Sequence, residues 1–199
     1  MNGVGNVRSP DTERGNKVPP GQRVTRKLPV LHYGPVPSID VSEWFFTISG
    51  LVKRERKLGC QEFASLPRVR VFSGVHCVIV WSKFNSLWKG VSSGALKELV
   101  DILPNARFVM VHSAEGHKTN LSLSDFFEPD VLFAFKHNGE SPTPEHGYPV
   151  GLVVPRLYFW KSAKWVVRVE FVAEDERGFW ESRGCHNRGD PWREERYSR

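Results

Sequence analysis

Cysteine is scarce in this sequence, and its scarcity narrows the kinds of site that the chain can form. Only three cysteines occur among 199 residues, at positions 60, 77 and 185. An odd number of widely spaced cysteines argues against the disulfide framework of a small secreted protein and is compatible with a reducing compartment. The sequence has no Cys-X-X-Cys-His haem motif and no cysteine set for an iron–sulfur cluster, which excludes these two redox centres.

Long apolar runs are absent as well. No run approaches the roughly 20 residues that span a bilayer, and residues 1–8 lack the hydrophobic core of a signal peptide. The composition, with 40% apolar and 25% charged residues, is that of a globular chain long enough to bury a substantial core. These features predict a cytoplasmic protein without a membrane span.

Positive charge gathers at the start of the chain. The formal net charge is +6, and residues 1–27 hold six Lys or Arg against two carboxylates, which is +4 of the total. Residues 1–25 are also rich in Gly, Pro and Asn without periodicity, so we expect a disordered basic leader followed by one domain over residues 26–199. A nucleic-acid binder is an alternative that rests on this leader alone, and composition favours a solvated leader.

The body of the chain predicts many strands and few short helices. Strand-like patterns cover residues 44–52, 68–72, 106–112 and 167–172, whereas residues 92–103 have helical spacing behind a capping serine. Residues 27–37 contain three prolines and should be extended, lying on the domain. The expected fold class is α+β, mixed and dominated by sheet.

The stretch from Phe72 to Val91 contains the candidate reactive group. A β-branched run places Cys77 near its end, and a polar, aromatic-rich loop is expected to follow. Such a thiol is presented rather than packed, and it could serve as a nucleophile, a redox thiol or a soft-metal ligand. A zinc site from His76, Cys77, Cys185 and His186 is disfavoured, because adjacent ligands on a strand point to opposite faces.

The motifs around this cysteine recur in order along the chain. The relevant segments are His76-Cys77, Trp81-Ser82-Lys83-Phe84, Trp88-Lys89-Gly90-Val91, and residues 29–37, 44–50, 143–149, 152–155, 158–165, 178–181 and 186–192. In these segments, over roughly residues 26–197, the chain resembles the sulfite oxidase and bacterial methionine-sulfoxide reductase type of molybdopterin-dependent oxidoreductase, in its short single-domain branch.

The resemblance implies a cofactor and a set of residues that hold it. It implies that the Cys77 thiolate binds molybdenum beside the two dithiolene sulfurs of molybdopterin, although tungsten would accept the same ligands. The implied cofactor-binding residues are His32, Tyr33, Ser113, His146, Ser162, Ala163 and Lys164. Lys161 and Lys164 could instead be solvated, and His146 could only stabilise a turn. The implied activity is two-electron oxygen-atom transfer on a small-molecule substrate, with a separate electron-transfer partner.

Two positions depart from the pattern that the resemblance leads us to expect. Val80 and Gly151 stand where arginines are usual, and each lost cation removes a charge-assisted hydrogen bond to an anionic cofactor. Arg156, Arg168 or Lys118 could compensate. The departures motivate an alternative function, a catalytically inactive cofactor- or ligand-binding module of the same fold.

Overall fold

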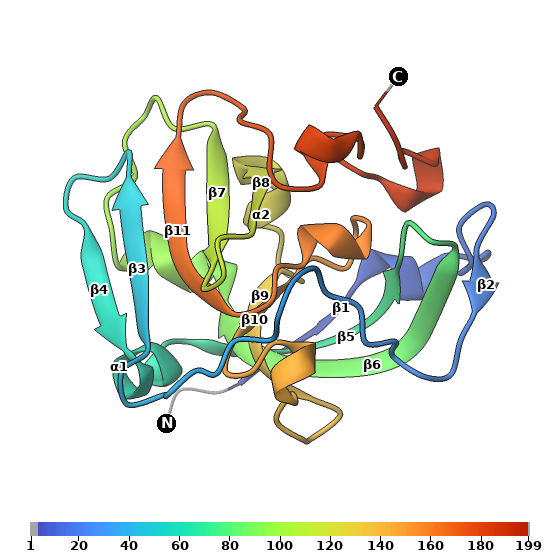
Figure 1. Cartoon of the computed structure of the whole chain (residues 1–199), viewed down its shortest axis with the longest axis horizontal. Coiled ribbons are helices and arrows are strands. Elements are labelled where there is room, and N and C mark those ends of the chain that lie inside the picture. Colours follow the sequence, from blue (N-terminus) through green and yellow to red (C-terminus); the bar gives the residue numbers. More distant parts are fainter. Residues whose placement is uncertain (1–3, 199) are drawn as a thin grey trace.

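A long antiparallel hairpin organises the first of two β-sheets. The computed structural model describes residues 4–198. The strands of this six-stranded sheet are β1 (Gly5–Arg8), β2 (Arg23–Val24), β5 (Arg68–His76), β6 (Trp81–Ser92), β9 (Leu132–His137) and β10 (Gly151–Val153). The order is β1-β5-β6-β9-β10, and β2 pairs with the first residues of β6, next to the β5–β6 turn (Figure 1). The hairpin turn between β5 and β6 spans residues 77–80 and contains Cys77.

The second sheet has five strands in the order β4-β3-β11-β7-β8. Its strands are β3 (Phe45–Gly50), β4 (Arg56–Gly59), β7 (Phe108–Ser113), β8 (Lys118–Ser122) and β11 (Val166–Val172). The central strand β11 runs parallel to β3 and antiparallel to β7. Its inner side chains, among them Val169 and Phe171, are fully buried, so alternation along the strand directs one face to the core.

The helices are short. They are α1 (Cys60–Ser65), α2 (Leu123–Phe126) and six 3-10 helices, η1 (Pro10–Glu13), η2 (Ser93–Glu98), η3 (Pro144–His146), η4 (Phe159–Lys161), η5 (Glu181–Arg183) and η6 (Pro191–Arg193). The helix expected over residues 92–103 is thus reduced to η2, which the Ser92 hydroxyl caps by accepting from the Gly94 amide. Within residues 4–198 no helix has the length and apolar character needed to cross a bilayer. This sheet-dominated α+β architecture confirms the expected fold class.

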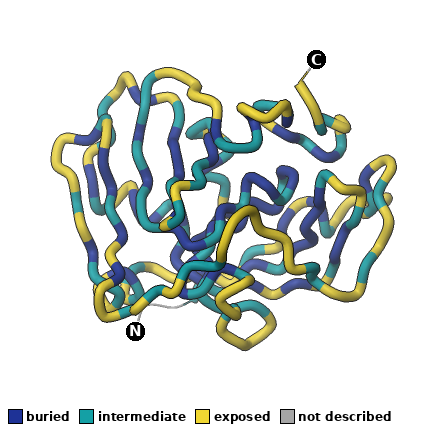
Figure 2. The backbone as a smooth tube through the Cα atoms, viewed as in Figure 1, coloured by how far each residue is buried: buried dark blue, intermediate teal, exposed yellow. Residues whose placement is uncertain are grey.

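The main core lies between the two sheets. It is centred on aromatic rings: Phe46 of β3 packs 4.5 Å from Phe63 of α1 and 5.0 Å from Phe133 of β9, measured between ring centroids. Figure 2 shows buried and intermediate residues along most of these inner strands, whereas the extended segment before β3 is mostly exposed. A smaller cluster of valines with Trp88 covers the other face of the hairpin sheet. The strands thus fix both faces of the sheet that carries the Cys77 turn.

The start of the chain differs from the sequence-based expectation. Residues 1–3 of the predicted disordered leader lie outside the described residues, but residues 4–25 hold β1, η1 and β2. β1 runs parallel to β5, Ser9 and Asp11 are buried, and the Thr25 amide donates to the Ser82 carbonyl. The segment is ordered by backbone pairing with the hairpin rather than by apolar burial, which is why its composition resembles that of a disordered tail.

Candidate functional site

Cys77 lies at the start of a tight four-residue turn. The Cys77 amide donates to the Trp81 carbonyl at 2.8 Å, and the Val80 amide donates to the Cys77 carbonyl at 3.1 Å. The expected aromatic-rich loop is therefore absent, because Trp81, Ser82, Lys83 and Trp88 belong to β6. Alternation along β6 buries Ser82 and Trp88, so a polar composition here marks a strand with a buried polar face rather than a loop.

The thiol itself is buried rather than presented. Cys77 is 9% exposed, and burial raises the pKa of its thiol above the usual range. Hydrogen bonds from backbone amides and the charge of Arg196 oppose this shift. A protonated thiol in a dry site is a poor free nucleophile, whereas a bound metal cation would stabilise the thiolate. The burial therefore favours a metal-ligand role over an exposed redox thiol.

An aromatic group connects the Cys77 turn with Tyr33. Val78 of the turn and Trp180 both pack against a buried cluster that contains Tyr158 and Cys185. The Tyr33 ring lies 4.9 Å from Phe179 and 6.2 Å from Trp180, between centroids, and 61% of Tyr33 is exposed. Tyr33 and the Cys77 turn are thus linked through a group of side chains that includes Trp180. Cys185, a ligand of the disfavoured zinc site, is a packing residue of this cluster.

A second group of predicted residues gathers around Lys164. The Lys164 ammonium donates to the carbonyls of Leu31 and Glu145 at 2.7 and 2.5 Å. Burial lowers the pKa of this lysine to about 8, against the opposing charges of Glu115 and Glu145. The ammonium can donate three hydrogen bonds and donates two of them to these carbonyls, so one donor remains for a ligand. His32 joins this group through an edge contact with the ring of Trp165, at 6.0 Å.

Three predicted residues already have partners in the protein. The ring of His146 contacts the Thr143 hydroxyl at 3.1 Å through Nδ1 and the Leu28 carbonyl at 3.3 Å through Nε2. The Ser162 hydroxyl accepts from the Val154 amide, and the Ala163 carbonyl accepts from the Leu152 amide. His146 therefore tethers the segment before β3 to η3, and the Ser162-Ala163 backbone extends the edge of β10.

Buried polar atoms without a partner lie near Lys164. Among the described residues, Ser113 Oγ and Glu115 Oε2 are buried and make no hydrogen bond. Ser113 ends β7 and Glu115 lies in the β7–β8 turn, where the Ala114 amide donates to the Trp165 carbonyl. Burial raises the pKa of Glu115. Because an unsatisfied buried polar group costs about 1–3 kcal/mol, these atoms fit a site for a ligand with its own donors and acceptors.

The residues proposed to replace the missing arginines are engaged elsewhere. Arg156 donates to Asp130 at 2.9 Å and pairs with Glu128, Arg168 pairs with Glu170, and Lys118 lies 3.8 Å from Glu176. Val80 is 44% exposed and has a φ of 65°, the left-handed region. A cation that does contact the Cys77 turn is Arg196, whose Nη1 donates to the Val78 carbonyl at 2.7 Å.

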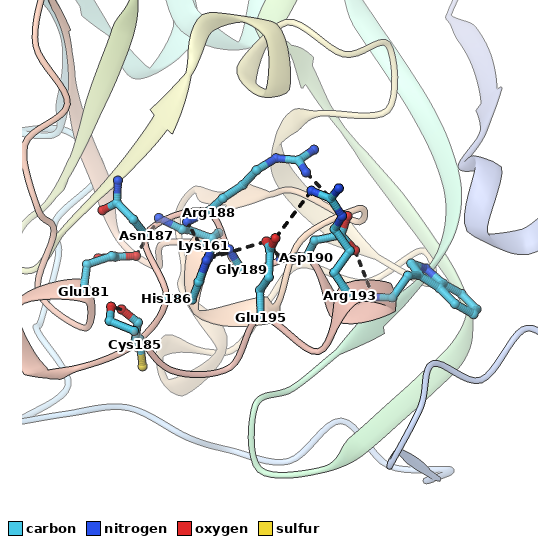
Figure 3. A network of polar contacts seen from close by, with 12 residues as sticks. Lys161, Glu181, Cys185, His186, Asn187, Arg188, Gly189, Asp190, Arg193 and Glu195 are labelled. Atoms are coloured by element: carbon cyan, nitrogen blue, oxygen red, sulfur yellow. Dashed lines mark hydrogen bonds and ion pairs between the residues drawn. The ribbon is translucent and has the colours of Figure 1, made fainter.

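Lys161 is not solvated. It is fully buried, pairs with Glu181 at 2.6 Å and donates to the carbonyl and side-chain oxygens of Asn120 (Figure 3). A cavity of about 370 Å³ opens beside it, lined also by Asp125 and Arg188. Arg188 is held by Asp125 through two contacts at 3.0 Å. The network attaches the segment after β11 to β8.

The structure does not form the alternative zinc site. Within residues 4–198, no group of three or more His, Cys, Asp or Glu side chains is arranged to hold a metal. His76 is fully buried, with Nδ1 at 2.8 Å from the Ser82 hydroxyl and Nε2 at 3.6 Å from Asp11. Asp11 and Gln22, which contact the β5–β6 hairpin, were not predicted from the sequence, because the Gly- and Pro-rich composition of residues 1–25 indicated a disordered leader.

Comparison with known proteins identifies the family of the chain. A family model described as "Oxidoreductase molybdopterin binding domain" matches residues 33–180. The chain is 42% identical over 188 residues to the "Uncharacterized oxidoreductase YuiH" of Bacillus subtilis (strain 168), covering 94% of this chain and 95% of that protein. It is 27% identical over 184 residues to a sulfite oxidase of Arabidopsis thaliana, covering 74% of this chain but only 47% of that one.

A solved structure shares the fold. The sulfane dehydrogenase SoxCD from Paracoccus pantotrophus superposes with a TM-score of 0.66 at 21% identity, over 72% of this chain and 41% of that one. This likeness concerns the fold alone. The family match covers well over half of the chain, and it confirms the resemblance found in the motifs: the chain belongs to the oxidoreductase molybdopterin binding domain family.

Proposed function

We propose that this molybdopterin-dependent oxidoreductase performs two-electron oxygen-atom transfer on a small substrate, with Cys77 as the protein ligand of molybdenum. Family membership supports the cofactor. The observation that carries the role of Cys77 is its position, since it is a buried thiol at the start of the β5–β6 turn, with both its amide and its carbonyl hydrogen-bonded. A metal ligand needs this fixed backbone and a dry surrounding.

The residues around Lys164, together with Tyr33, suit the organic part of the cofactor. Ser113 Oγ and Glu115 Oε2 offer buried, unused hydrogen-bonding atoms, and Tyr33 offers an exposed ring. Lys164, with one unspent proton, would receive the phosphate group, and an anion there would raise its pKa from about 8. His32, His146, Ser162 and Ala163 would line this side and hold its backbone.

When bound, the cofactor supplies the two-electron redox chemistry. The chain contributes orientation, exclusion of water around Cys77 and charge at the phosphate end. All three cysteines are free thiols, which is why we propose a reducing, cytoplasmic location. We also propose that electrons are exchanged with a separate protein, because the sequence provides no second redox centre.

Elemental analysis tests the proposal directly. The full chain is purified from a host that makes molybdopterin, together with Cys77→Ala and, as a matched control, Cys60→Ala at the start of α1. We expect about one molybdenum or tungsten atom per chain in the wild type and in the control, and none in Cys77→Ala. Metal retained by Cys77→Ala at the wild-type level would contradict the assignment.

Turnover decides between an enzyme and an inactive module. The metal-loaded wild type should reduce an artificial electron acceptor when an oxidisable small substrate is present, and Cys77→Ala should not. A metal-loaded wild type that shows no substrate-dependent reduction over a broad panel of substrates would favour the cofactor-binding module, for which Val80 and Gly151 are the sequence evidence.

A further inference from the structure

The two ends of the described chain hold the carbonyl groups of the Cys77 turn. The Gln22 side-chain amide donates to the Cys77 carbonyl at 3.1 Å. Arg196 donates to the Val78 carbonyl at 2.7 Å, and the Arg23 amide donates to the Val80 carbonyl at 2.8 Å. Three of the four carbonyls of the turn are thus bound by residues that come before position 24 or after position 195.

Arg196 also joins the two end segments to each other. Its Nη2 donates to the Pro20 carbonyl at 3.2 Å while Nη1 holds Val78, and its guanidinium lies over the Tyr158 ring at 5.1 Å from the centroid. Gly21 has a φ of +67°, and a Cβ there would lie 3.3 Å from Arg196 Nη2. A glycine at this position allows the turn before Gln22 to approach the guanidinium closely.

A buried polar chain extends from Gln22 into the hairpin. The Ser82 hydroxyl donates to Gln22 Oε1 at 3.4 Å and contacts His76 Nδ1 at 2.8 Å. Asp11 faces the other nitrogen of His76 and accepts from the Trp192 indole at 3.3 Å. His76, Ser82 and Asp11 are almost fully buried, so this chain has a single arrangement that depends on both end segments.

We propose that Gln22 and Arg196 are positioning residues that fix the orientation of the Cys77 turn, and hence of the thiol, for metal binding. This inference rests on the proposed role of Cys77. The two residues lie outside residues 33–180, the part that the family model matches, so neither role follows from family membership. Val80 stands where an arginine is expected, and Arg196 brings a positive charge to the backbone of the same turn.

We call the hydrogen bonds from Gln22 and Arg196 to the Cys77 turn the two clamps. The test compares variants that remove these clamps with matched control variants at exposed positions away from the turn. Gln22→Leu and Arg196→Met delete the donors and keep side-chain bulk. Gln61→Leu on exposed α1 and Arg193→Met, whose side chain is 68% exposed, are the controls. Each full-length protein is measured for metal content, for the electron paramagnetic resonance spectrum of the bound molybdenum, for its unfolding midpoint and for the alkylation rate of Cys77 by peptide-resolved mass spectrometry.

We expect both clamp variants to remain folded and to show a molybdenum spectrum that differs from the wild type, while both controls keep the wild-type spectrum. In protein that carries no metal, the alkylation rate of Cys77 is taken at its high-pH limit, because losing the Arg196 charge also disfavours the thiolate. At this limit Cys77 should be alkylated about fivefold faster in the clamp variants, the change that corresponds to losing one hydrogen bond of about 1 kcal/mol. Arg196→Lys, which keeps one donor but not the fork, should lie between the wild type and Arg196→Met.

The outcomes separate this inference from the proposed function. A wild-type spectrum in a metal-loaded Gln22→Leu and Arg196→Met would overturn the clamp and leave the role of Cys77 intact. If the wild type binds no metal at all, the proposed function fails and the alkylation rates decide. Equal rates in variants and controls would then reject the clamp too, whereas faster alkylation in the clamp variants alone would support it.

Discussion

The Lys161–Glu181 pair is the most deeply buried ion pair among the described residues. Both side chains are about 1% exposed, with the nitrogen and oxygen 2.6 Å apart. Glu181 Oε1 also accepts from the Trp160 indole at 2.9 Å. Two desolvated charges compensate each other only as a pair, so removing one leaves the other without a counter-charge. Burial also disfavours the charged form of Lys161 and lowers its pKa, and the charge of Glu181 opposes this shift.

Lys161→Met should therefore lower the free energy of unfolding by about 3–5 kcal/mol. The double variant Lys161→Met/Glu181→Gln, which removes both charges and keeps an acceptor for Trp160, should be more stable than the single one. Lys53→Met is the control, because Lys53 pairs with Asp101 at 69% exposure and should cost at most about 1 kcal/mol. Urea titrations measure all three, and a double variant no better than Lys161→Met would contradict this account.

The contact between β6 and β9 depends on one glycine. At Gly90 the pairing register shifts, and a Cβ there would lie 2.0 Å from the Phe133 carbonyl oxygen and 2.7 Å from the Ala134 Cα. Both obstacles are backbone atoms of a central strand, which cannot move aside without breaking the sheet. The β5–β6 hairpin that carries Cys77 is thereby seated against β9 at one defined position.

Gly90→Ala should destabilise the protein by about 3 kcal/mol, the upper end of the usual cost of overpacking. Gly59→Ala is the matched control, because Gly59 precedes α1 and nothing lies within 4 Å of its Cβ position. This control should change the unfolding free energy by less than about 0.5 kcal/mol. Thermal or urea unfolding measures the stability of both variants. Equal stabilities of Gly90→Ala and Gly59→Ala would show that the β9 backbone moves to accommodate the added methyl group.

The elements that the sequence predicts well are those with periodic side chains. Residues 68–72 and 167–172 alternate visibly, and both are strands in the structure. β6 could not be recognised in the same way, because its buried face includes Ser82, Lys83 and Ser86. β1 and β2 are joined to the sheet by backbone hydrogen bonds, which leave no apolar pattern in the sequence.

The residues proposed for the site fall into two groups for the same reason. Cys77, His32, Tyr33 and Lys164 could be proposed from the sequence because they lie in motifs with a recognisable order. Gln22 and Arg196 could be proposed only from the structure, since they reach the Cys77 turn from segments more than 50 and 100 residues away. Single-sequence patterns describe neighbours along the chain, and long-range contacts between polar side chains have no periodicity to detect.

For the molecule as a whole, we expect the protonation of His137 to lower the free energy of unfolding in acid. This histidine stacks on Trp88 with centroids 4.2 Å apart and contacts the Ser86 hydroxyl at 3.2 Å. Burial, assisted by the charges of Lys83 and His146, lowers its pKa from 6.5 to about 4. Between these two values the unfolded chain binds the proton and the folded one does not, so stability falls as the pH drops from 6.5 to about 4.

His137→Phe keeps an aromatic ring on Trp88 and removes the titration. The free energy of unfolding, measured with urea at closely spaced pH values from 4 to 7, should depend less steeply on pH in this variant than in the wild type. Near pH 5, the slopes of the unfolding free energy against pH should differ between the two proteins by the amount that corresponds to about one bound proton. Parallel curves would show that other groups carry the acid sensitivity.

The joining of both end segments at one turn also sets an order of events during synthesis. The Arg196 hydrogen bonds to Val78 and Pro20 close chain separations of 118 and 176 residues. Until residue 196 has left the ribosome, the turn around Cys77 lacks one of its supports, however far the two sheets have formed (Figure 1). Contacts of such long range form late. Metal and pterin would therefore enter a fold in which both sheets and the segment around residue 196 have already formed.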